Sequence, residues 1–391
     1  MAKVRLGDIA TVVTKGTTPT TMGFQFEDGG INFVKIESIS EDGTFLKEKF
    51  SHISDECNVQ MRRSQLQEND ILFSIAGAIG RSAIVTKEIL PANTNQALAI
   101  IRVPKGKIDY NYLLYALSSS AINQQATQHQ QGVAQLNISL KNVSDFLLPI
   151  YTEAMQKRIV HNLKKIDKLI SLRKQQLAKL DELVKARFVE MFGTFPANPF
   201  RWSIGKIQDV VSDVRYGSSR PAVEGGKYPY LRMNNITYSG ELDLRDTKRI
   251  DIPDSELDKC TVRRGDVLFN RTNSKELVGK TCVYNRDELM VLAGFVIRVR
   301  INERIRPEVL SAFLNMDFSK RMLIGMCKTA IGQANINAKE LQNIDLYIPP
   351  IELQDQFVTL KNKIDQQKQT VQQSLEKLEL LKKALMQEYF G

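Results

Sequence analysis

The segment 274–281 comes nearest to a nucleotide-binding motif, because it ends in Gly279-Lys280-Thr281 and follows an apolar stretch that predicts a strand. A phosphate-binding loop needs a glycine at its start and a helix N-terminus at its end, so that backbone N–H groups cradle the phosphates. Here Ser274 replaces the first glycine, and Cys282-Val283-Tyr284 alternates like a strand. The sequence therefore argues against nucleotide binding, and a degenerate P-loop enzyme is kept only as an alternative.

Three further groups have residue types found in catalytic sites. The histidines, which lack the spacing of metal ligands, are His52, His129 and His161. An acidic cluster resembles a nuclease site but also fits an exposed polar loop, and it comprises Asp254, Glu256, Asp258 and Lys259. Asn198-Pro199-Phe200 resembles part of an amino-methyltransferase tetrapeptide, but it lacks one proline and no glycine-rich cofactor loop precedes it. We therefore expect no catalytic residue, metal or cofactor on this chain, and interpret 193–202 as a hinge.

The composition permits a nucleic-acid partner. The 391-residue chain has a net charge of +10 and a pI near 9.3, and basic side chains that neutralise phosphates release counterions. The cysteines form no C-x-x-C pair, which fits reduced thiols, and they are Cys57, Cys260, Cys282 and Cys327. Neither a signal-peptide pattern nor a long apolar run occurs, so we expect a cytoplasmic protein without a membrane span.

Two long helices are predicted, and they repeat each other with an offset of 198 residues. Lys165-Ile166-Asp167 returns as Lys363-Ile364-Asp365, and Phe192-Gly193 returns as Phe390-Gly391. Apolar residues at alternating spacings of four and three predict a coiled-coil seam. The seam residues, expected to pair the helices or to dock a partner, are Ile159, Leu163, Ile166, Ile170, Leu177, Leu180, Ile364, Val371, Leu375, Leu378 and Leu385. Lysines interrupt the second seam at Lys361, Lys368 and Lys382, whereas a wider stripe that favours a further protein partner includes Leu169, Leu172, Leu183 and Leu381.

A block of mixed strand and turn pattern precedes each helix, and the two blocks also match. Asn69-Asp70-Ile71-Leu72-Phe73 returns as Gly265-Asp266-Val267-Leu268-Phe269, a turn that feeds a buried strand. Gln135-Leu136-Asn137-Ile138 returns as Gln333-Ala334-Asn335-Ile336. Within each block we expect one helix, around residues 110–125 and 307–326.

The predicted fold class is α/β (mixed α+β), with two similar globules alternating with two long helices. We expect the helices to pair as an antiparallel coiled coil, which relates the globules by a pseudo-two-fold axis. The expected domains are 1–150 and 194–349 for the globules, and 151–193 and 350–391 for the helices. Two heads held on paired helices could read two short DNA half-sites with an unread spacer between them.

This order resembles the specificity subunit of type I restriction–modification systems over essentially the full chain. The resemblance is carried by the duplicated globules, by the duplicated helices that end in Phe-Gly, and by the Gln-x-Asn-Ile junctions. It implies that each globule is a target recognition domain for one half of a bipartite, asymmetric sequence in double-stranded DNA. It also implies that the helices set the spacer and dock two methyltransferase subunits, which bring S-adenosylmethionine. A restriction/translocase subunit that uses ATP would join them, and this chain would perform no chemistry.

Base edges are read by Arg or Lys on guanine and by Asn or Gln on adenine, with Ser and Thr adaptable. In the first globule the candidate DNA-binding residues are Lys15, Thr17, Thr18, Lys35, Arg81, Asn95 and Gln96. In the second globule they are Arg215, Tyr216, Ser218, Arg232, Asn234, Arg271, Asn273 and Lys280. Glycines that suit a close approach of the loop backbone to DNA are Gly77, Gly80 and Gly279. A rival from another class is a coiled-coil adaptor that binds only proteins.

Overall fold

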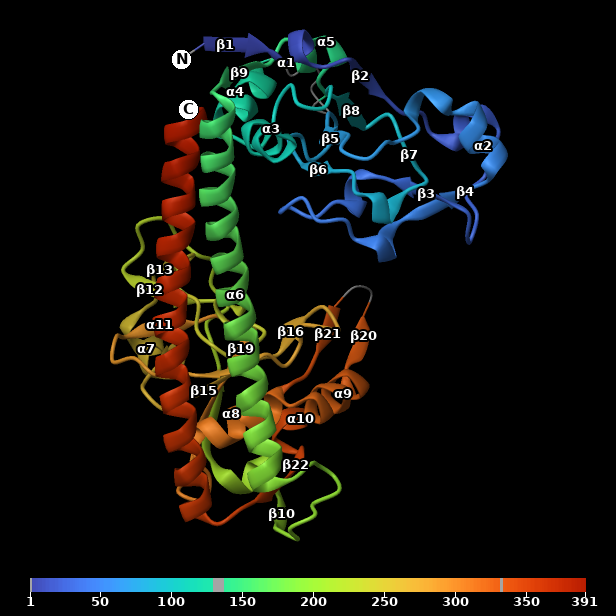
Figure 1. The fold of residues 1–391 in the computed structure, drawn as a ribbon. Helices are drawn as coiled ribbons and strands as arrows, with labels where there is room; N and C mark the ends of the chain where they lie inside the picture. Colours follow the sequence, from blue (N-terminus) through green and yellow to red (C-terminus); the bar gives the residue numbers. More distant parts are fainter. Residues whose placement is uncertain (1, 129–136, 331–332) are drawn as a thin grey trace. The chain divides into compact units, whose positions relative to one another are not determined.

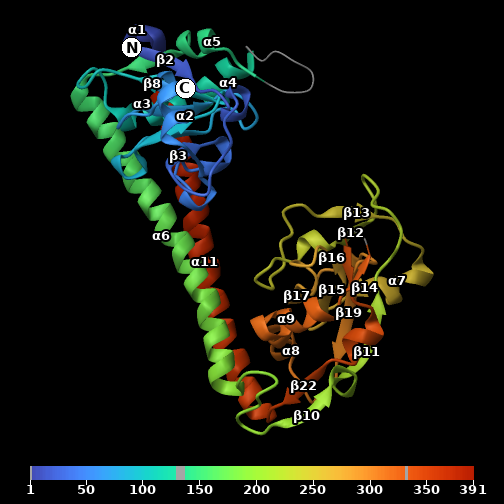
Figure 2. The ribbon, with the colours of Figure 1, turned by 90° about the vertical axis from the view of Figure 1, so that its right-hand side faces the viewer.

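The computed structural model describes residues 2–128, 137–330 and 333–391, which form two compact units. Unit 1 contains Met1–Arg173 together with Ser374–Gly391, and unit 2 contains Lys174–Gln373. Each unit therefore combines one globule with the first half of one long helix and the second half of the other. The long helices are α6 (Glu153–Phe192) and α11 (Ile351–Phe390), and Figures 1 and 2 show them side by side within each unit.

The globule of unit 1 contains two main sheets, with strand orders β2-β8-β5-β6 and β4-β3-β7, and the small pair β1-β9. Its strands are β1 (Ala2–Arg5), β2 (Val12–Lys15), β3 (Ile31–Val34), β4 (Ser51–Ile53), β5 (Ile71–Ser74), β6 (Ser82–Ile84), β7 (Ala92–Thr94), β8 (Leu98–Arg102) and β9 (Leu147–Ile150). Its helices are α1 (Leu6–Ile9), α2 (Asp55–Gln60), α3 (Tyr110–Leu117), α4 (Ser120–Gln128) and α5 (Leu140–Ser144).

The globule of unit 2 repeats this order, with sheets β11-β19-β15-β17 and β13-β12-β18-β14, the pair β10-β22, and the three-stranded sheet β16-β21-β20. Its strands are β10 (Ser203–Lys206), β11 (Val211–Tyr216), β12 (Tyr228–Leu231), β13 (Lys248–Ile250), β14 (Thr261–Val262), β15 (Val267–Asn270), β16 (Thr272–Asn273), β17 (Thr281–Val283), β18 (Met290–Leu292), β19 (Val296–Ile301), β20 (Lys328–Ala330), β21 (Gln333–Asn335) and β22 (Asp345–Ile348). Its helices are α7 (Asp254–Cys260), α8 (Pro307–Asn315), α9 (Asp317–Met326) and α10 (Ala338–Gln342).

Strands β5 and β15 are buried along their whole length, and their first three residues are apolar, because both faces of their sheets are covered. In β5, Ile71 and Phe73 enter the core beneath the helices, whereas Leu72 enters the core shared with the second sheet. In β15, Phe269 and Leu268 divide between two cores in the same way. Period-two side-chain alternation therefore builds two cores from one strand.

The expectation of two similar mixed globules alternating with two antiparallel paired helices is confirmed. In unit 1, Asp167 of α6 forms an ion pair of 2.6 Å with Lys382 of α11. In unit 2, Asp181 of α6 contacts Lys368 of α11, so residue numbers rise along one helix and fall along its partner. The α6 and α11 helices lie within the ranges 151–193 and 350–391.

The lysines that interrupt the second seam have acidic partners. Lys368 is 8% exposed and donates to Asp181 and to Glu241 of the adjoining globule. Desolvation lowers the pKa of the Lys368 amine, but these two carboxylates outweigh it, so that the pKa lies above its ordinary value. Lys361 pairs with Asp365 one turn further along the same helix.

The Phe-Gly ends of the helices belong to the opposite globule's unit. Phe192 closes α6 and packs in the core of unit 2, with its ring centroid 5.4 Å from that of Phe357. Phe390 closes α11 and packs in the core of unit 1, with its centroid 5.3 Å from that of Tyr112. The repeated phenylalanine thus anchors each helix in the globule that the other helix follows.

Two details differ from the sequence-based expectations. Each predicted globule helix is two helices, α3 and α4 in unit 1 and α8 and α9 in unit 2. Ser119 interrupts the first pair and accepts a hydrogen bond from the Ile122 N–H, because serine competes well for backbone groups at helix starts. The segment 193–202, interpreted as a hinge, is fastened within unit 2: Trp202 Nε1 donates to the Phe192 carbonyl, 3.1 Å away.

Candidate nucleic-acid interface

Two glycines, at matching positions in the two units, begin the loops that follow β2 and β11 and carry predicted DNA-binding residues. A Cβ atom on Gly16 would lie 1.7 Å from the Thr94 carbonyl oxygen, and one on Gly217 would lie 2.1 Å from the Leu292 oxygen. Only glycine permits this approach of the loop to the end of strand β7 or β18. The residues beside them, Lys15 and Tyr216, end strands β2 and β11.

Arg81 and Lys280, both predicted to contact DNA, bind backbone carbonyls at equivalent positions of the two units. Arg81 Nη1 lies 2.9 Å from the Ile39 oxygen, and Lys280 Nζ lies 2.6 Å from the Ile236 oxygen. Lys280 is 7% exposed, and burial lowers the pKa of its amine. The strand β17 that begins at Thr281 also differs from the helix that a phosphate-binding loop requires.

Replacing Lys280 with methionine is expected to destabilise the chain, because two buried carbonyls lose their donor. The expected loss is about 1–3 kcal/mol, which corresponds to a fall in Tm of roughly 2–12 °C for a domain of this size. Thermal unfolding measures this, with Lys275→Met as the control, because Lys275 is exposed in the same loop. Unchanged stability with weakened DNA binding would contradict the structural role.

The other candidates of unit 1 lie at the surface or just beneath it. Lys15 and Gln96 are exposed, and the Thr18 hydroxyl donates to Gln96 Oε1. Lys35 Nζ lies 4.2 Å from the centroid of the Phe26 ring, a cation–π contact. The remaining candidates are half-buried: Thr17, and Asn95, which accepts from the Ala97 N–H at 3.1 Å.

Two of the candidate cations of unit 2 have carboxylate partners. Arg215 pairs with Asp213 at 2.8 Å, and Arg232 pairs with Asp246 at 2.9 Å. These carboxylates already neutralise part of the charge that a phosphate or a base would meet. Ser218 is buried and accepts from the Arg220 N–H at 3.2 Å, which makes it a turn residue in this structure.

Three of the last four candidates of unit 2 lie on or contact the segment between β15 and β17. The Arg271 guanidinium carbon lies 4.9 Å from the centroid of the Tyr216 ring. Arg271 Nη2 donates to Asn335 Oδ1 at 3.0 Å, and the Tyr216 hydroxyl accepts from the Ala338 N–H at 2.8 Å. Asn273 Oδ1 accepts from the Ser274 N–H at 2.9 Å. Asn234 is exposed on the turn after β12.

The glutamines that join each globule to its long helix were not among the candidates. Gln156 Oε1 accepts from the Asp109 N–H at 3.0 Å, and Gln354 Oε1 accepts from the Arg306 N–H at 2.8 Å. Both are buried, and each also donates to a carbonyl just before its helix. Their offset of 198 residues was a usable signal, since a polar residue kept at a buried helix position needs a partner.

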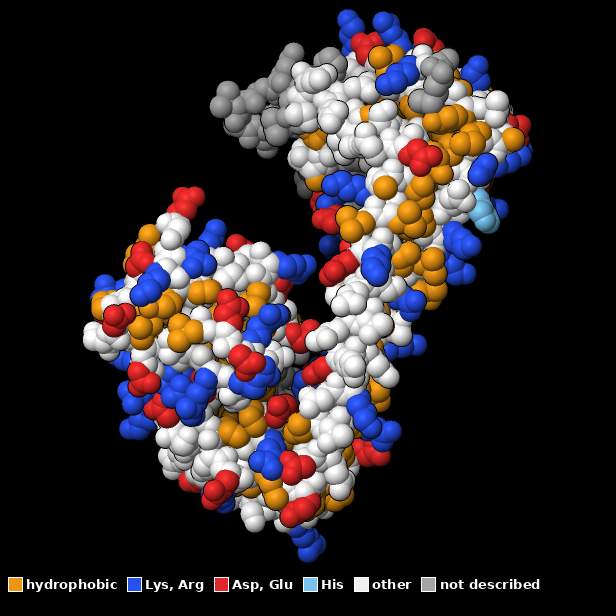
Figure 3. All heavy atoms as spheres, turned by 90° about the vertical axis from the view of Figure 1, so that its left-hand side faces the viewer, with side chains coloured by type: hydrophobic (Ala, Val, Ile, Leu, Met, Phe, Trp, Pro, Cys, Tyr) orange, Lys and Arg blue, Asp and Glu red, His pale blue; other side chains and the backbone are white. Residues whose placement is uncertain are grey.

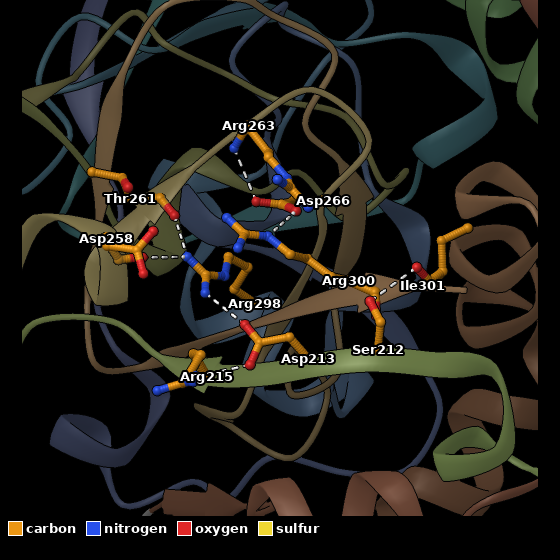
Figure 4. A network of polar contacts seen from close by, with 10 residues as sticks. All are labelled: Ser212, Asp213, Arg215, Asp258, Thr261, Arg263, Asp266, Arg298, Arg300 and Ile301. Atoms are coloured by element: carbon orange, nitrogen blue, oxygen red, sulfur yellow. Dashed lines mark hydrogen bonds and ion pairs between the residues drawn. The ribbon is translucent and has the colours of Figure 1, made fainter. Parts of the chain in front are cut away.

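An arginine–aspartate network stiffens the sheet of unit 2 (Figure 4). Arg298 is 2% exposed, and its guanidinium donates to Asp213 at 2.7 Å and to two backbone carbonyls. Desolvation raises the pKa of Asp213, but the bonds from Arg215 and Arg298 outweigh it and leave the pKa below its ordinary value. A second pair, Arg300 with Asp266, matches Arg102 with Asp70 in unit 1. The Arg298 part has no match in unit 1, where isoleucine stands 198 residues earlier.

The helix candidates fall into a packed face and an open face. The predicted seam residues are all buried or half-buried: Ile159, Leu163, Ile166, Ile170, Leu177, Leu180, Ile364, Val371, Leu375, Leu378 and Leu385. Leucines of the wider stripe are exposed: Leu169, Leu172, Leu183 and Leu381, with Leu380 beside them. Hydrophobic side chains are visible on the surface of the helix pair in Figure 3. Leu183 and Leu381 are 198 residues apart, one in each unit.

Other functional classes receive no support from the described ranges. His, Cys, Asp and Glu side chains do not form a group of three suited to a metal ion there. Among the same residues, no helix combines the length and apolar character of a bilayer span. His129 and Gln135 lie outside the described residues, and Gln333 is described only by its backbone in β21.

The chain is similar to known proteins over both halves. The family model described as the type I restriction modification DNA specificity domain matches residues 1–182 and again 201–380. The type I restriction enzyme EcoKI specificity subunit of Escherichia coli K12 is 25% identical over 191 residues, covering 48% of this chain and 41% of that protein. The Escherichia coli EcoBI specificity subunit is 30% identical over 169 residues, covering 42% and 35%. The chain thus matches less than half the length of these relatives.

Two solved structures share the fold. A chain from work on complex assembly and conformational transition of the type I R-M system has a TM-score of 0.60 and 19% identity, covering 100% of this chain and 97% of that one. The type I restriction-modification S subunit from M. genitalium has a TM-score of 0.54 and 14% identity, covering 100% and 96%. At these sequence identities, the likeness shows the fold alone.

Proposed function

We propose that this chain, which belongs to the family of type I restriction–modification DNA specificity subunits, selects the DNA sequence on which a larger complex acts. Each globule would bind one half of a bipartite target in double-stranded DNA. The paired helices would set the spacer between the half-sites and dock two methyltransferase subunits. Those partners would hold S-adenosylmethionine, and a restriction/translocase subunit would use ATP, so that this chain performs no chemistry itself.

One observation carries the proposal: the two units share their internal supports and differ in their exposed polar groups. Gly16 and Gly217 occupy the same tight turn, and Gln156 and Gln354 make the same bonds. By contrast, the Lys35 amine lies over the Phe26 ring in unit 1, whereas in unit 2 the Arg271 guanidinium lies over the Tyr216 ring. This is what two readers of different half-sites require, because base contacts specify whereas scaffold contacts only position.

Two equivalent docking sites for one kind of partner follow from the exposed leucines. Leu183 and Leu381 are 39% and 48% exposed at matching helix positions, one in each unit. Exposed leucines on a helix that already has a packed seam indicate an additional interface. A partner that recognises one of them would recognise the other through a similar helix surface, which supports two copies of the same methyltransferase subunit.

Replacing Leu381 with lysine is expected to weaken the docking of one methyltransferase copy by on the order of 1–2 kcal/mol, because a charge would be buried at the contact. Native mass spectrometry at limiting concentration should then show complexes with one copy where the unchanged chain binds two. Leu183→Lys should act on the other copy, and Val59→Lys, on an exposed globule residue, serves as the control. Two bound copies in both leucine variants would exclude this face as the docking site.

The experiment that tests the function is methylome sequencing of cells that express the methyltransferase partner with and without this chain. A methylated motif of two short parts, present only with the chain, is the expected result. DNA binding by the purified complex should also fall steeply with salt, because phosphate contacts release counterions. Binding that is absent or independent of salt would favour the rival protein adaptor.

A further inference from the structure

Arg271 differs from the other candidate cations of unit 2 in what holds it. Arg215 and Arg232 have carboxylate partners, and the Lys280 amine is buried on backbone carbonyls. Among the described residues, the Arg271 guanidinium contacts two neutral groups, the Tyr216 ring and the Asn335 amide oxygen. Its positive charge is therefore oriented without being neutralised.

The backbone around Arg271 is held from both sides. The Arg271 N–H donates to the Phe295 carbonyl at 3.0 Å, and the Arg271 carbonyl accepts from the Ile336 N–H at 2.9 Å. Phe295 is 55% exposed and Tyr216 is 37% exposed. The guanidinium thus lies on a rigid strand end with aromatic side chains at the surface around it, which limits the entropy lost when it binds a ligand.

The remaining donors of Arg271 define the ligand. Its Nε is buried and has no hydrogen-bond partner among the described residues, so the terminal nitrogens are the donors left to meet a ligand. A guanidinium carries only donors, arranged as a planar fork. In the major groove, guanine presents two adjacent acceptors, N7 and O6, whereas adenine presents an acceptor beside an amino donor. The fork fits guanine and leaves the adenine amino group unmatched.

We propose that Arg271 reads the N7 and O6 edge of a guanine in the half-site bound by unit 2, with Tyr216 and Asn335 as positioning residues. The proposal rests on the proposed function and names a specificity-determining residue within it. Tyr216 keeps the guanidinium plane fixed, and Asn335 Oδ1 fixes its rotation through one Nη2 hydrogen. Base discrimination at this one position depends on both constraints.

In unit 1, other residue types stand at the positions of Arg271 and Tyr216. The Ile138 N–H donates to the Ile75 carbonyl at 3.0 Å, as the Ile336 N–H does to Arg271, so Ile75 occupies the Arg271 position. Lys15 stands in the place of Tyr216 before the tight glycine turn. A change at Arg271 should therefore affect one half of the target and leave the other half unchanged.

The test is the methylome of cells that express the methyltransferase partner with the Arg271→Ala chain. The expected motif tolerates other bases at one guanine of one half-site, where discrimination falls by on the order of ten- to a hundredfold. Arg271→Lys keeps the charge but loses the fork, so an intermediate loss is expected. Asn335→Asp places a carboxylate against the guanidinium and should relax the same position without removing Arg271.

Arg264→Ala is the matched control. Arg264 precedes the same strand β15, at its other end, and is paired with Asp287 at 2.7 Å. This variant removes an equal charge from unit 2 and should leave the motif unchanged. Thermal unfolding of each variant shows that the chain is folded, and Asn335→Asp keeps the proposal testable if Arg271→Ala is unstable.

A phosphate contact is the alternative that the measurements separate from base reading. Removing a phosphate contact weakens binding to all sequences alike and lowers the salt slope by about one. Three outcomes would each overturn the proposal: such a uniform weakening of binding, an intact motif in both Arg271 variants, or a change in the other half-site. If the unchanged chain directs no two-part methylated motif, the proposed function itself fails and the assignment of Arg271 fails with it.

Discussion

Exchanging residues 1–150 for the equivalent block of a relative is expected to change one half of the methylated motif and to leave the other half and the spacing intact. Each mismatched base pair typically costs about 1–3 kcal/mol, so a half-site of several bases should switch completely. The methylome of cells expressing the chimera with the methyltransferase partner measures this. A change in both halves, or in neither, would contradict one reader per unit.

The boundary of the exchange should affect the stability of the chimera. Residues 153–173 of α6 belong to the same compact unit as residues 374–391 of α11, where Asp167 pairs with Lys382. A chimera cut at residue 150 keeps that pairing, whereas one that exchanges residues 1–173 alone mixes two helices that did not evolve together. The longer exchange should therefore be less stable, and an exchange of 1–173 with 374–391 should restore stability.

Replacing Phe192 with alanine is expected to lower the free energy of unfolding of unit 2 by about 3–5 kcal/mol, because a fully buried aromatic side chain leaves a cavity. The lost contacts are those of the ring cluster with Phe188 and Phe357. Phe390→Ala should have an effect of the same size on unit 1, through its contact with Tyr112. Denaturant unfolding gives the magnitude, and hydrogen exchange assigns it to a unit.

Phe200→Ala is the control for this pair, because Phe200 is 48% exposed close to the same helix end. Its stability should stay within about 0.5 kcal/mol of the unchanged chain, as is usual for surface sites. The decisive result is which of the two units each variant destabilises. If Phe192→Ala loosens unit 1 or Phe390→Ala loosens unit 2, the helix ends do not anchor the units in the way that the contacts indicate.

The repeat and the periodicity were enough to predict the fold class. The helices follow from local sequence, because a 3.5-residue apolar spacing specifies both a helix and a paired face. The strands β5 and β15 also follow from local sequence, because each is a short apolar run that begins directly after a turn, in Asp-Ile-Leu-Phe and Asp-Val-Leu-Phe. The split of each globule helix was missed, since Ser119 and Met316 interrupt a pattern that continues apolar on both sides.

The sequence alone determined that this protein has two similar halves on paired helices, because those features depend on residue type and spacing along the chain. Only the tertiary structure decided which cationic side chains are bound to groups within the protein and which can contact a ligand. The Lys280 amine donates to the carbonyls of Met233 and Ile236, more than forty residues earlier in the chain. The Arg271 guanidinium contacts Tyr216, earlier in the chain, and Asn335, later in it. Partners at such separations come together only through the fold, so composition and spacing could name the candidate readers but not choose among them.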